Sequence, residues 1–231
     1  MDKHKPVGPP RDIEASLPAA QQLFTGLRGT LREGGPVLYR AAYSPEGIVP
    51  DRIRNPYRFG PPKPLIAAGG TMPFQWLYLA PEVDTTIWEA QFARNDLRQP
   101  GTFYLDPGAE QVGLIATITF PRVLRFWDLR APASSLLGIY DQLSSPDHEW
   151  CQWFGVRLHD AMQLVEPADR PDGVLYPSRR YRGQDAMILS FDALEPMRPE
   201  ITFTATRFVE HASHARLQGD ALRSEPPEPV A

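Results

Sequence analysis

Short runs of apolar residues, separated by turns rich in proline and glycine, recur along the chain and predict buried β-strands. We expect strands over residues 37–42, 76–81, 112–120, 123–129, 173–176, 186–191 and 201–208. Apolar residues at helical spacing predict helices over 84–93, 133–143 and 12–28, where Pro18 suggests a break or a fresh helix start. A further helix begins at 144–147 and carries Trp150, Trp153 and Phe154. Because helices and strands come in groups and do not alternate regularly, the pattern predicts an α+β fold.

The same pattern divides the chain into three parts. Residues 1–35 form an N-terminal extension that we expect to be partly disordered, residues 36–210 a single domain, and residues 211–231 a loose, polar C-terminal tail. Two polar stretches interrupt the domain. The 94–110 stretch contains Pro-Gly and Asp-Pro-Gly turns, which are typical of an insertion, and the 44–75 stretch is a long loop whose arginines favour a functional role.

The composition is that of an ordinary globular protein and narrows the classes of function. Of the 231 residues, 42% are apolar and 23% are charged, and the formal net charge of −4 argues against a nucleic-acid-binding protein. Cys151 is the only cysteine, so we expect no disulfide within the chain and a reducing, cytoplasmic compartment. The sequence has no apolar segment typical of a signal peptide and no run of about 18 apolar residues, so we expect no membrane span.

Five residues at strand ends, on loops or near helix starts carry chemistry that fits one ligand: Arg40, Arg58, Tyr78, Glu89 and Ser178. Arginine holds phosphate oxygens in a bidentate fork, and a tyrosine ring stacks on a planar ring while its hydroxyl bonds a sugar. A carboxylate stabilises an oxocarbenium-like centre, and a serine at a strand-to-loop corner donates to a phosphate or an amide. The set predicts a cleft that binds a dinucleotide and cleaves its N-glycosidic bond.

Each of these residues also has a purely structural interpretation. Tyr78 is then an aromatic residue of a buried strand, Glu89 a solvated residue on a helix face, and Ser178 a turn cap. Arg58 is then only an exposed, hydrated side chain on its loop. Arg40 lies in an apolar strand, where an unpaired charge is costly, so a partner or a ligand is expected beside it.

Motifs of several other functional classes are absent from the sequence. No serine lies in a Gly-x-Ser-x-Gly elbow, which argues against a hydrolase triad. The His-Glu pair at 148–149 has no second histidine four residues on, and the histidines at 211 and 214 have no other ligand nearby, so we expect no metal site. The arginine cluster at 179–182 could contact RNA, but the net acidity and the lack of a stacking motif argue against it.

Six segments of the chain together resemble the RES-domain family, which is named for its Arg, Glu and Ser residues and consists mostly of toxins from bacterial toxin–antitoxin pairs. They are Leu-Tyr-Arg (38–40), Tyr-Arg-Phe (57–59), Leu-Tyr-Leu-Ala (77–80) with the following helix and Glu89, Leu-Arg-Phe-Trp-Asp-Leu (124–129), Asp-Gly-Val-Leu-Tyr-Pro-Ser-Arg (172–179) and Ala-Met-Ile-Leu-Ser-Phe-Asp (186–192). Their order and chemistry are similar to the family over about residues 36–195.

The resemblance implies an α+β fold similar to that of ADP-ribosyltransferases, with a core of two small β-sheets, flanking helices and NAD+ bound in the cleft between the sheets. It implies a toxin that degrades NAD+, as its substrate, at the nicotinamide–ribose bond by phosphorolysis or hydrolysis. One alternative is a mono-ADP-ribosyltransferase that uses the same site to modify a cellular protein. Another is a non-catalytic binding module whose pocket is only a relic.

On the same basis, Arg58, Glu89 and Ser178 match the family's signature residues and are the implied catalytic set. Tyr78 matches the pocket tyrosine, and Arg40 resembles a second pocket cation. The arginines would then hold the pyrophosphate, and Tyr78 would pack on the nicotinamide or the ribose. Glu89 would bond the ribose hydroxyls and stabilise the developing positive charge, while Ser178 would orient the amide or a phosphate.

The sequence departs from the family pattern around the signature arginine. Tyr57 stands before Arg58 where the family usually has a small residue, and the loop from Arg58 to Tyr78 is longer than usual. Arg52 or Arg54 is therefore an alternative phosphate ligand, and we include Arg54 among the expected substrate-binding residues.

The resemblance also implies an antitoxin protein as the partner, with which the chain would form an oligomer, and phosphate as a candidate co-substrate. Residues 1–35 and 94–110 lie outside the family pattern and could bind the antitoxin, cover the cleft or build an oligomer. Trp150, Trp153 and Phe154 belong either to the core or to an interface. We expect no contact with a membrane or with nucleic acid.

Overall fold

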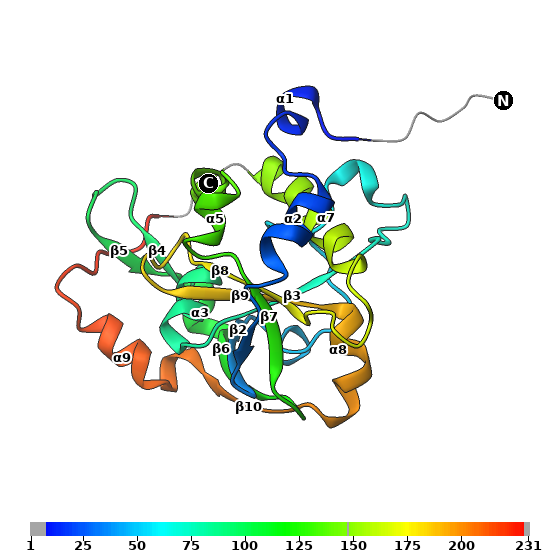
Figure 1. Ribbon diagram of the computed structural model, residues 1–231. Coiled ribbons are helices and arrows are strands. Elements are labelled where there is room, and N and C mark those ends of the chain that lie inside the picture. The colour runs from blue at the N-terminus through cyan, green and yellow to red at the C-terminus, as the bar shows by residue number, and fades with distance from the viewer. Residues whose placement is uncertain (1–7, 147, 229–231) are drawn as a thin grey trace.

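Two β-sheets form the centre of the computed structural model, which describes residues 8–146 and 148–228 (Figure 1). The larger sheet has the strand order β1 (Arg32–Gly34), β7 (Leu124–Asp128), β8 (Gly173–Pro177), β9 (Asp185–Ser190) and β3 (Trp76–Leu79). Its pairs are antiparallel except β7 and β8, which are parallel. The smaller sheet has the antiparallel order β10 (Thr202–Arg207), β6 (Leu114–Thr119) and β2 (Val37–Ala42). A separate hairpin pairs β4 (Ala93–Asn95) with β5 (Phe103–Leu105).

The two larger sheets meet where β2 passes the end of β3. A backbone bridge joins Tyr39 to Ala80, with N···O distances of 2.8 and 3.0 Å. Arg40 lies one residue from this bridge on β2, and Tyr78 lies two residues from it on β3. The arrangement confirms the predicted α+β fold, with small β-sheets and flanking helices.

Side chains that alternate along the larger sheet supply two hydrophobic cores. Ala186 and Ile188 of β9 face the first core, whereas Met187 and Leu189 face the second. Both faces of the sheet are therefore covered, which explains why its central strands are nearly continuous apolar runs in the sequence.

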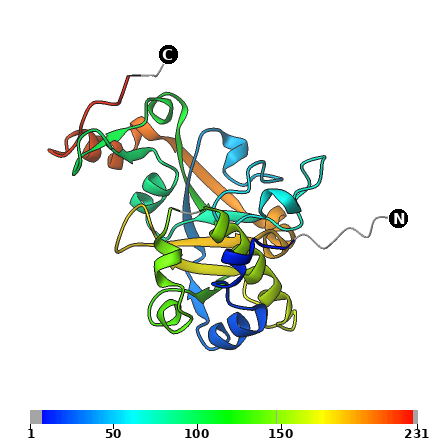
Figure 2. The same ribbon diagram turned by 90° about the horizontal axis from the view of Figure 1, so that it is seen from above.

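Helices cover the first face of the larger sheet. Seen from above, α2 (Ala20–Leu27) and α7 (His148–Gln163) lie side by side (Figure 2), and the short helices α5 (Ala133–Leu136) and α6 (Tyr140–Ser144) complete this layer. Trp150, Trp153 and Phe154 of α7 are buried in the first core, so the structure assigns them to the core. Residue 147, part of the predicted helix start, lies outside the described residues.

The second face of the larger sheet packs against the smaller sheet and α8 (Phe191–Met197). The opposite side of the smaller sheet carries a third core, which it shares with α3 (Val83–Glu89), α4 (Pro107–Val112) and α9 (Ala212–Gln218). The buried residues of this core include Ile87, Phe92, Ile115, Phe208 and Leu217. It anchors α3, whose last residue is Glu89.

Several predicted boundaries differ from the structure, and for two of the helices the backbone gives the reason. The helix predicted over 84–93 ends at Glu89, because Gln91 adopts a left-handed backbone with φ of 61°. The helix predicted over 133–143 is broken at Gly138, where φ is 68°. The strand predicted over 112–120 begins only at Leu114.

The 94–110 stretch holds regular structure that the insertion pattern did not predict. Besides most of β4 and the whole of β5, it contains the start of α4. Asp106 caps this helix by accepting a 3.0 Å hydrogen bond from the Ala109 N–H, and Pro107 occupies its first turn. The Asp-Pro-Gly sequence is therefore a helix start and not only a turn.

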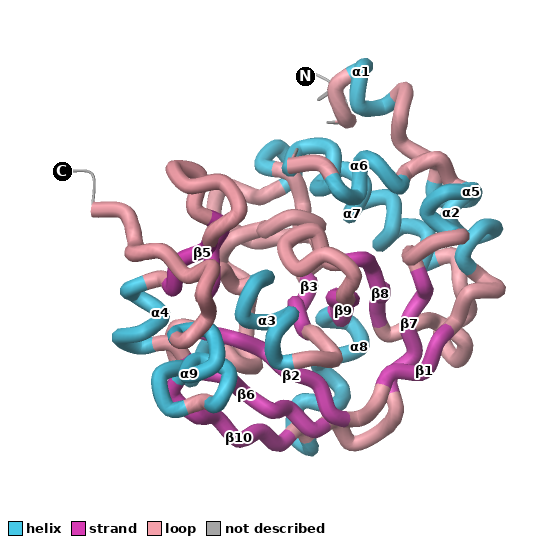
Figure 3. Tube along the Cα trace, turned by 90° about the vertical axis from the view of Figure 1, so that its left-hand side faces the viewer, coloured by secondary structure: helices cyan, strands magenta, loops and turns pink. Residues whose placement is uncertain are grey.

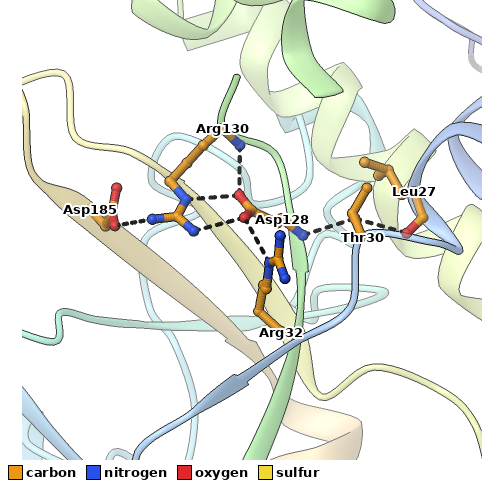
Figure 4. Close-up of polar contacts among 6 residues, drawn as sticks. All are labelled: Leu27, Thr30, Arg32, Asp128, Arg130 and Asp185. Carbon is orange, nitrogen blue, oxygen red and sulfur yellow. Dashed lines mark hydrogen bonds and ion pairs between the residues drawn. The ribbon is translucent and has the colours of Figure 1, made fainter. Parts of the chain in front are cut away.

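Part of the 1–35 extension is tied into the larger sheet, and the expectation that another part of it is disordered stays a prediction. Leu23 and Leu27 of α2 are fully buried in the first core. Thr30 Oγ1 accepts a hydrogen bond from the Asp128 N–H at 3.1 Å and donates to the Leu27 carbonyl at 2.8 Å (Figure 4). Short α1 (Arg11–Glu14) precedes this segment, and residues 1–7 lie outside the described residues.

The segment after residue 210 also differs from the expected loose tail. It forms α9, whose Leu217 is 4% exposed in the third core. Further on, Ser224 donates from its backbone to the Phe103 carbonyl at 2.7 Å and from its hydroxyl to Asp96 at 3.0 Å. Only one apolar residue of this helix is buried, so the sequence showed no apolar periodicity there. Residues 229–231 lie outside the described residues.

Candidate functional site

A cavity of about 500 Å³ lies where the two sheets and α3 meet. Figure 3 shows α3 beside β2. Residues of several segments contribute to its walls, among them Arg40 from β2, Tyr78 from β3, Glu89 from α3, Tyr176 from β8, and Arg179 and Arg180 from the loop after β8. The structure therefore gathers residues that are up to 140 positions apart in the chain, from Arg40 to Arg180.

Tyr78 presents a neutral phenol to the cavity. Its hydroxyl oxygen accepts a 2.7 Å hydrogen bond from the Phe59 N–H, and its ring packs edge to face on Tyr57, with ring centroids 5.7 Å apart. Burial raises the pKa of Tyr78 above its usual range, so the phenol stays protonated at neutral pH. Because the oxygen accepts from Phe59, its O–H hydrogen is left for a bound ligand.

Glu89 and Ser178 form one hydrogen-bonded unit. Ser178 Oγ donates to Glu89 Oε1 at 2.6 Å and accepts from the Tyr181 N–H at 3.0 Å. The Ser178 N–H in turn donates to the Gln184 carbonyl at 2.8 Å, which fixes the backbone where β8 ends. Ser178 is 5% exposed and does not itself line the cavity, so its hydroxyl orients the Glu89 carboxylate and does not face the cavity directly.

Arg58 lines the cavity, but most of its guanidinium is engaged by the protein. Its Nη2 donates to the Leu143 carbonyl at the end of α6 and lies 3.4 Å from the Ser145 carbonyl. Its Nε donates to Cys151 Sγ at 3.3 Å. The last carbonyls of a helix lack partners within the helix, so this arginine caps α6 and joins it to α7 and the long loop.

Arg40 is held by two backbone carbonyls. Its Nε donates to the Gly47 carbonyl at 2.9 Å and its Nη1 to the Tyr78 carbonyl at 2.5 Å. Burial lowers the pKa of Arg40 to about 10, so it remains a cation at neutral pH. The partners that we expected for the buried charge of Arg40 are therefore these two backbone carbonyls. No carboxylate among the described residues forms an ion pair with Arg40.

Arg54 and Arg52 do not line this cavity; both side chains are exposed. The residue between them explains why. Ile53 is buried in the second core, and its N–H donates to the Gln75 side chain at 2.5 Å. Because Ile53 points inward, its two neighbours are directed to solvent.

The sequence did not point to several residues that build the site. Thr86 of α3 accepts a 2.6 Å hydrogen bond from the Ala41 N–H and so holds the helix against β2. Tyr176 lies two residues before Ser178, so the two-residue period of a strand could have placed it on the same face. Arg179 and Arg180 were visible as a basic cluster, but only the fold brings them to Glu89.

Positive charge dominates the cavity. Among the described residues, its lining holds five arginines, namely Arg40, Arg58, Arg94, Arg179 and Arg180, and a single carboxylate, Glu89. Such a lining favours an anionic ligand, and the tyrosine rings favour one with a planar group.

A search for a metal centre and for a membrane span gives no candidate in the described parts of the chain. In residues 8–146 and 148–228, no group of three or more His, Cys, Asp or Glu side chains could hold a metal ion. No helix in those ranges is long and apolar enough to cross a membrane.

Comparison with known proteins agrees with this geometry. No curated protein matches the chain. The family model described as the RES domain matches residues 38–209 of the 231 residues, a span that contains Arg40, Arg58, Tyr78, Glu89 and Ser178. Because this match covers well over half of its length, the chain belongs to the RES-domain family.

Proposed function

We propose that the protein is an NAD+-consuming enzyme that cleaves the nicotinamide–ribose bond and acts in the cytoplasm as the toxin of a toxin–antitoxin pair. Membership of the RES-domain family supports this function. The observation that carries it is the Glu89 carboxylate, which Ser178 orients in a cavity whose lining also includes five arginines and several tyrosines.

The proposed reaction places the negative charge of Glu89 where positive charge develops. When the bond between ribose C1′ and the nicotinamide nitrogen breaks, its electron pair leaves with nicotinamide, and the ribose becomes oxocarbenium-like. The carboxylate of Glu89 stabilises that charge, and the 2.6 Å hydrogen bond from Ser178 holds it in place. An oxygen of phosphate or water then bonds to C1′, and an acceptor that carries a proton releases it to solvent.

The rest of the cavity suits the remainder of the dinucleotide. Its volume of about 500 Å³ is in the range of small-molecule sites. Tyr78 offers a ring face to the nicotinamide or the ribose, and its free O–H hydrogen can bond a sugar oxygen. The arginines complement the negative diphosphate.

Release of nicotinamide from NAD+ tests the proposal. Purified protein is incubated with NAD+, with and without inorganic phosphate, beside a Glu89→Gln control that keeps an acceptor for Ser178. We expect release by the wild type and a loss of about 10³-fold or more in the control. The 1″-phosphate of ADP-ribose identifies phosphorolysis, free ADP-ribose identifies hydrolysis, and label on a protein identifies ADP-ribosyl transfer.

Absence of nicotinamide release at high enzyme concentration, with or without phosphate, would contradict the proposal and favour a non-catalytic binding module. Expression of the two proteins in bacteria gives a second readout. The wild type should arrest growth and the Glu89→Gln variant should not. A co-expressed antitoxin protein should restore growth by forming a complex with the wild type.

A further inference from the structure

Arg179 and Arg180 differ from the other arginines of the cavity because they have no hydrogen-bond or ion-pair partner among residues 8–146 and 148–228. Both follow Ser178 directly, both line the cavity and both are half-buried. Within the described ranges, neither makes a hydrogen bond or an ion pair. A half-buried guanidinium that has lost part of its hydration without gaining an acceptor is energetically unfavourable, unless a ligand supplies the missing acceptors.

The remaining cavity arginines are occupied by the protein. Arg40 donates to two carbonyls, and Arg58 donates to carbonyls and to the Cys151 sulfur. Arg94 lies 3.2 Å from Asp106 and donates to the Gln91 carbonyl at 3.2 Å. Their donors are therefore largely committed to holding the fold, which leaves the pair after Ser178 as the free one.

The local electrostatics favour an anion beside this pair. Burial and the charge of Arg58 lower the pKa of Arg179, while burial and the charges of Arg179, Arg94 and Arg58 lower that of Arg180. Glu89, the only carboxylate that the described part of the chain contributes to the lining, already accepts from Ser178. A bound anion would relieve the repulsion among these cations.

The backbone that carries the pair is fixed at both ends. Tyr181 donates to Ser178 Oγ, Ser178 donates to the Gln184 carbonyl, and Gly183 adopts a left-handed φ of 83° that closes the turn. The two guanidinium groups therefore project from a short turn whose shape does not depend on the ligand, which lowers the entropy lost on binding.

We propose that Arg179 and Arg180 form the phosphate-binding subsite of this cavity, and that Arg58 is a positioning residue that holds no phosphate. The inference rests on the proposed function, because the expected ligands are the diphosphate of NAD+ and the inorganic phosphate acceptor. Both present phosphate oxygens to a guanidinium pair, and the experiment below distinguishes them.

The test compares the double variant Arg179→Gln/Arg180→Gln with Arg182→Gln. Arg182 belongs to the same basic cluster but is exposed and lines a different cavity. Binding of ADP-ribose, adenosine and inorganic phosphate to each full-length protein is measured by calorimetry. We expect the double variant to lose about tenfold or more in affinity for a phosphate-containing ligand, and to bind adenosine within about twofold of the wild type. Arg182→Gln should match the wild type for all three ligands.

The ligand that is affected identifies the source of the phosphate oxygens. Weaker ADP-ribose binding in phosphate-free buffer assigns the subsite to the diphosphate. Unchanged ADP-ribose binding with weaker binding of inorganic phosphate assigns it to the acceptor. The proposal is overturned if the double variant binds both as the wild type does, if Arg182→Gln loses as much affinity, or if the wild type binds neither.

Binding without turnover separates this inference from the proposed function. If NAD+ is not cleaved but the double variant still loses ADP-ribose or phosphate, the subsite stands and the proposed function fails. If NAD+ is cleaved but both variants bind as the wild type does, the subsite fails alone.

The melting temperature gives a control for a structural role. Because the pair has no partner among the described residues, the double variant should melt at or above the wild-type temperature, whereas a structural role of the two arginines would lower the melting temperature. An Arg179→Lys/Arg180→Lys variant, which keeps the charges but not the bidentate forks, should bind with intermediate affinity and carries the test if the first variant does not fold.

Discussion

Ser178 Oγ lies 2.6 Å from Glu89 Oε1, although 89 positions separate the two residues in the chain. One residue ends α3 and the other follows β8, so the bond forms only when the third core seats α3 against the sheets. The acid and its orienting hydroxyl therefore depend on the same packing, and the stability of the fold and the precision of the site are linked.

Replacing Ser178 by alanine should slow catalysis more than it weakens binding. The loss of one hydrogen bond to a charged group corresponds to about 10- to 100-fold. Because Ser178 acts through Glu89 and does not line the cavity, we expect that loss in kcat for NAD+ cleavage and little change in KM. Ser178→Thr, which keeps the hydroxyl, should recover part of the rate. An equal loss in Ser178→Thr, or a loss confined to KM, would contradict this positioning role.

Arg58 should contribute mainly to stability. Its removal leaves the buried Leu143 carbonyl and the part-buried Ser145 carbonyl without this donor, so Arg58→Gln should lower the free energy of unfolding by about 2–4 kcal/mol in urea titrations. Arg54→Gln is the matched control, because Arg54 is exposed and should change stability by less than about 0.5 kcal/mol. A variant at Arg58 with wild-type stability but no ADP-ribose binding would show that this arginine holds substrate instead.

Gly60, two residues after Arg58, must be a glycine because the backbone of Pro56 passes very close to it. A Cβ at Gly60 would lie 1.8 Å from the Pro56 carbonyl oxygen, a distance that no local adjustment absorbs. We expect Gly60→Ala to destabilise the protein by more than about 3 kcal/mol, measured as a lower melting temperature or loss of soluble protein. Gly69→Ala on the same loop is the control, since no atom lies within 4 Å of its Cβ position. Equal melting temperatures for the two variants would disprove the expected clash.

Much of the fold could be predicted from the sequence, because strands that are buried on both sheet faces leave long apolar runs. The β9 strand is an example, with Met187 and Leu189 on one face and Ile188 on the other. Elements that bury a single apolar residue left no such signal. The α9 helix, which buries Leu217 alone, was missed for this reason.

The sequence predicted which residue types line the candidate site, but not which of its arginines are bonded to the protein and which are available to a ligand. Arg40 and Glu89 were expected from their chemistry, and both line the cavity. Whether an arginine is free to bind a ligand depends on carbonyls and acids that tertiary packing brings to it. Arg58 contacts the end of α6, whereas Arg179 and Arg180 contact no acceptor in the part of the chain that the structure describes, and no local pattern in the sequence distinguishes the two cases.

Stability at low pH should depend on Asp128, which ties the N-terminal segment to the sheet (Figure 4). Its carboxylate lies 2.7 Å from Arg130 Nη2 and 3.6 Å from Arg32 Nε. Burial acts to raise the pKa of Asp128, but the hydrogen bonds and charge of Arg130 outweigh it, and the net shift is downward. A carboxyl whose pKa is lower in the folded state stabilises the fold above its unfolded pKa of about 3.9, and this contribution is lost as the pH falls through the lower folded value.

Asp128→Asn should therefore lower the free energy of unfolding by about 1–2 kcal/mol at pH 7, and the difference from the wild type should shrink below about pH 4. Asp51→Asn is the matched control. Asp51 also faces an arginine, Arg198 at 3.6 Å, but its side chain is 99% exposed, so its replacement should cost less than about 0.5 kcal/mol at any pH. Urea unfolding of the three proteins between pH 3 and pH 7 gives the comparison. A difference for Asp128→Asn that stays constant over this range would mean that the amide loses packing or hydrogen-bond geometry and not a charge, and the electrostatic role of Asp128 would have to be abandoned.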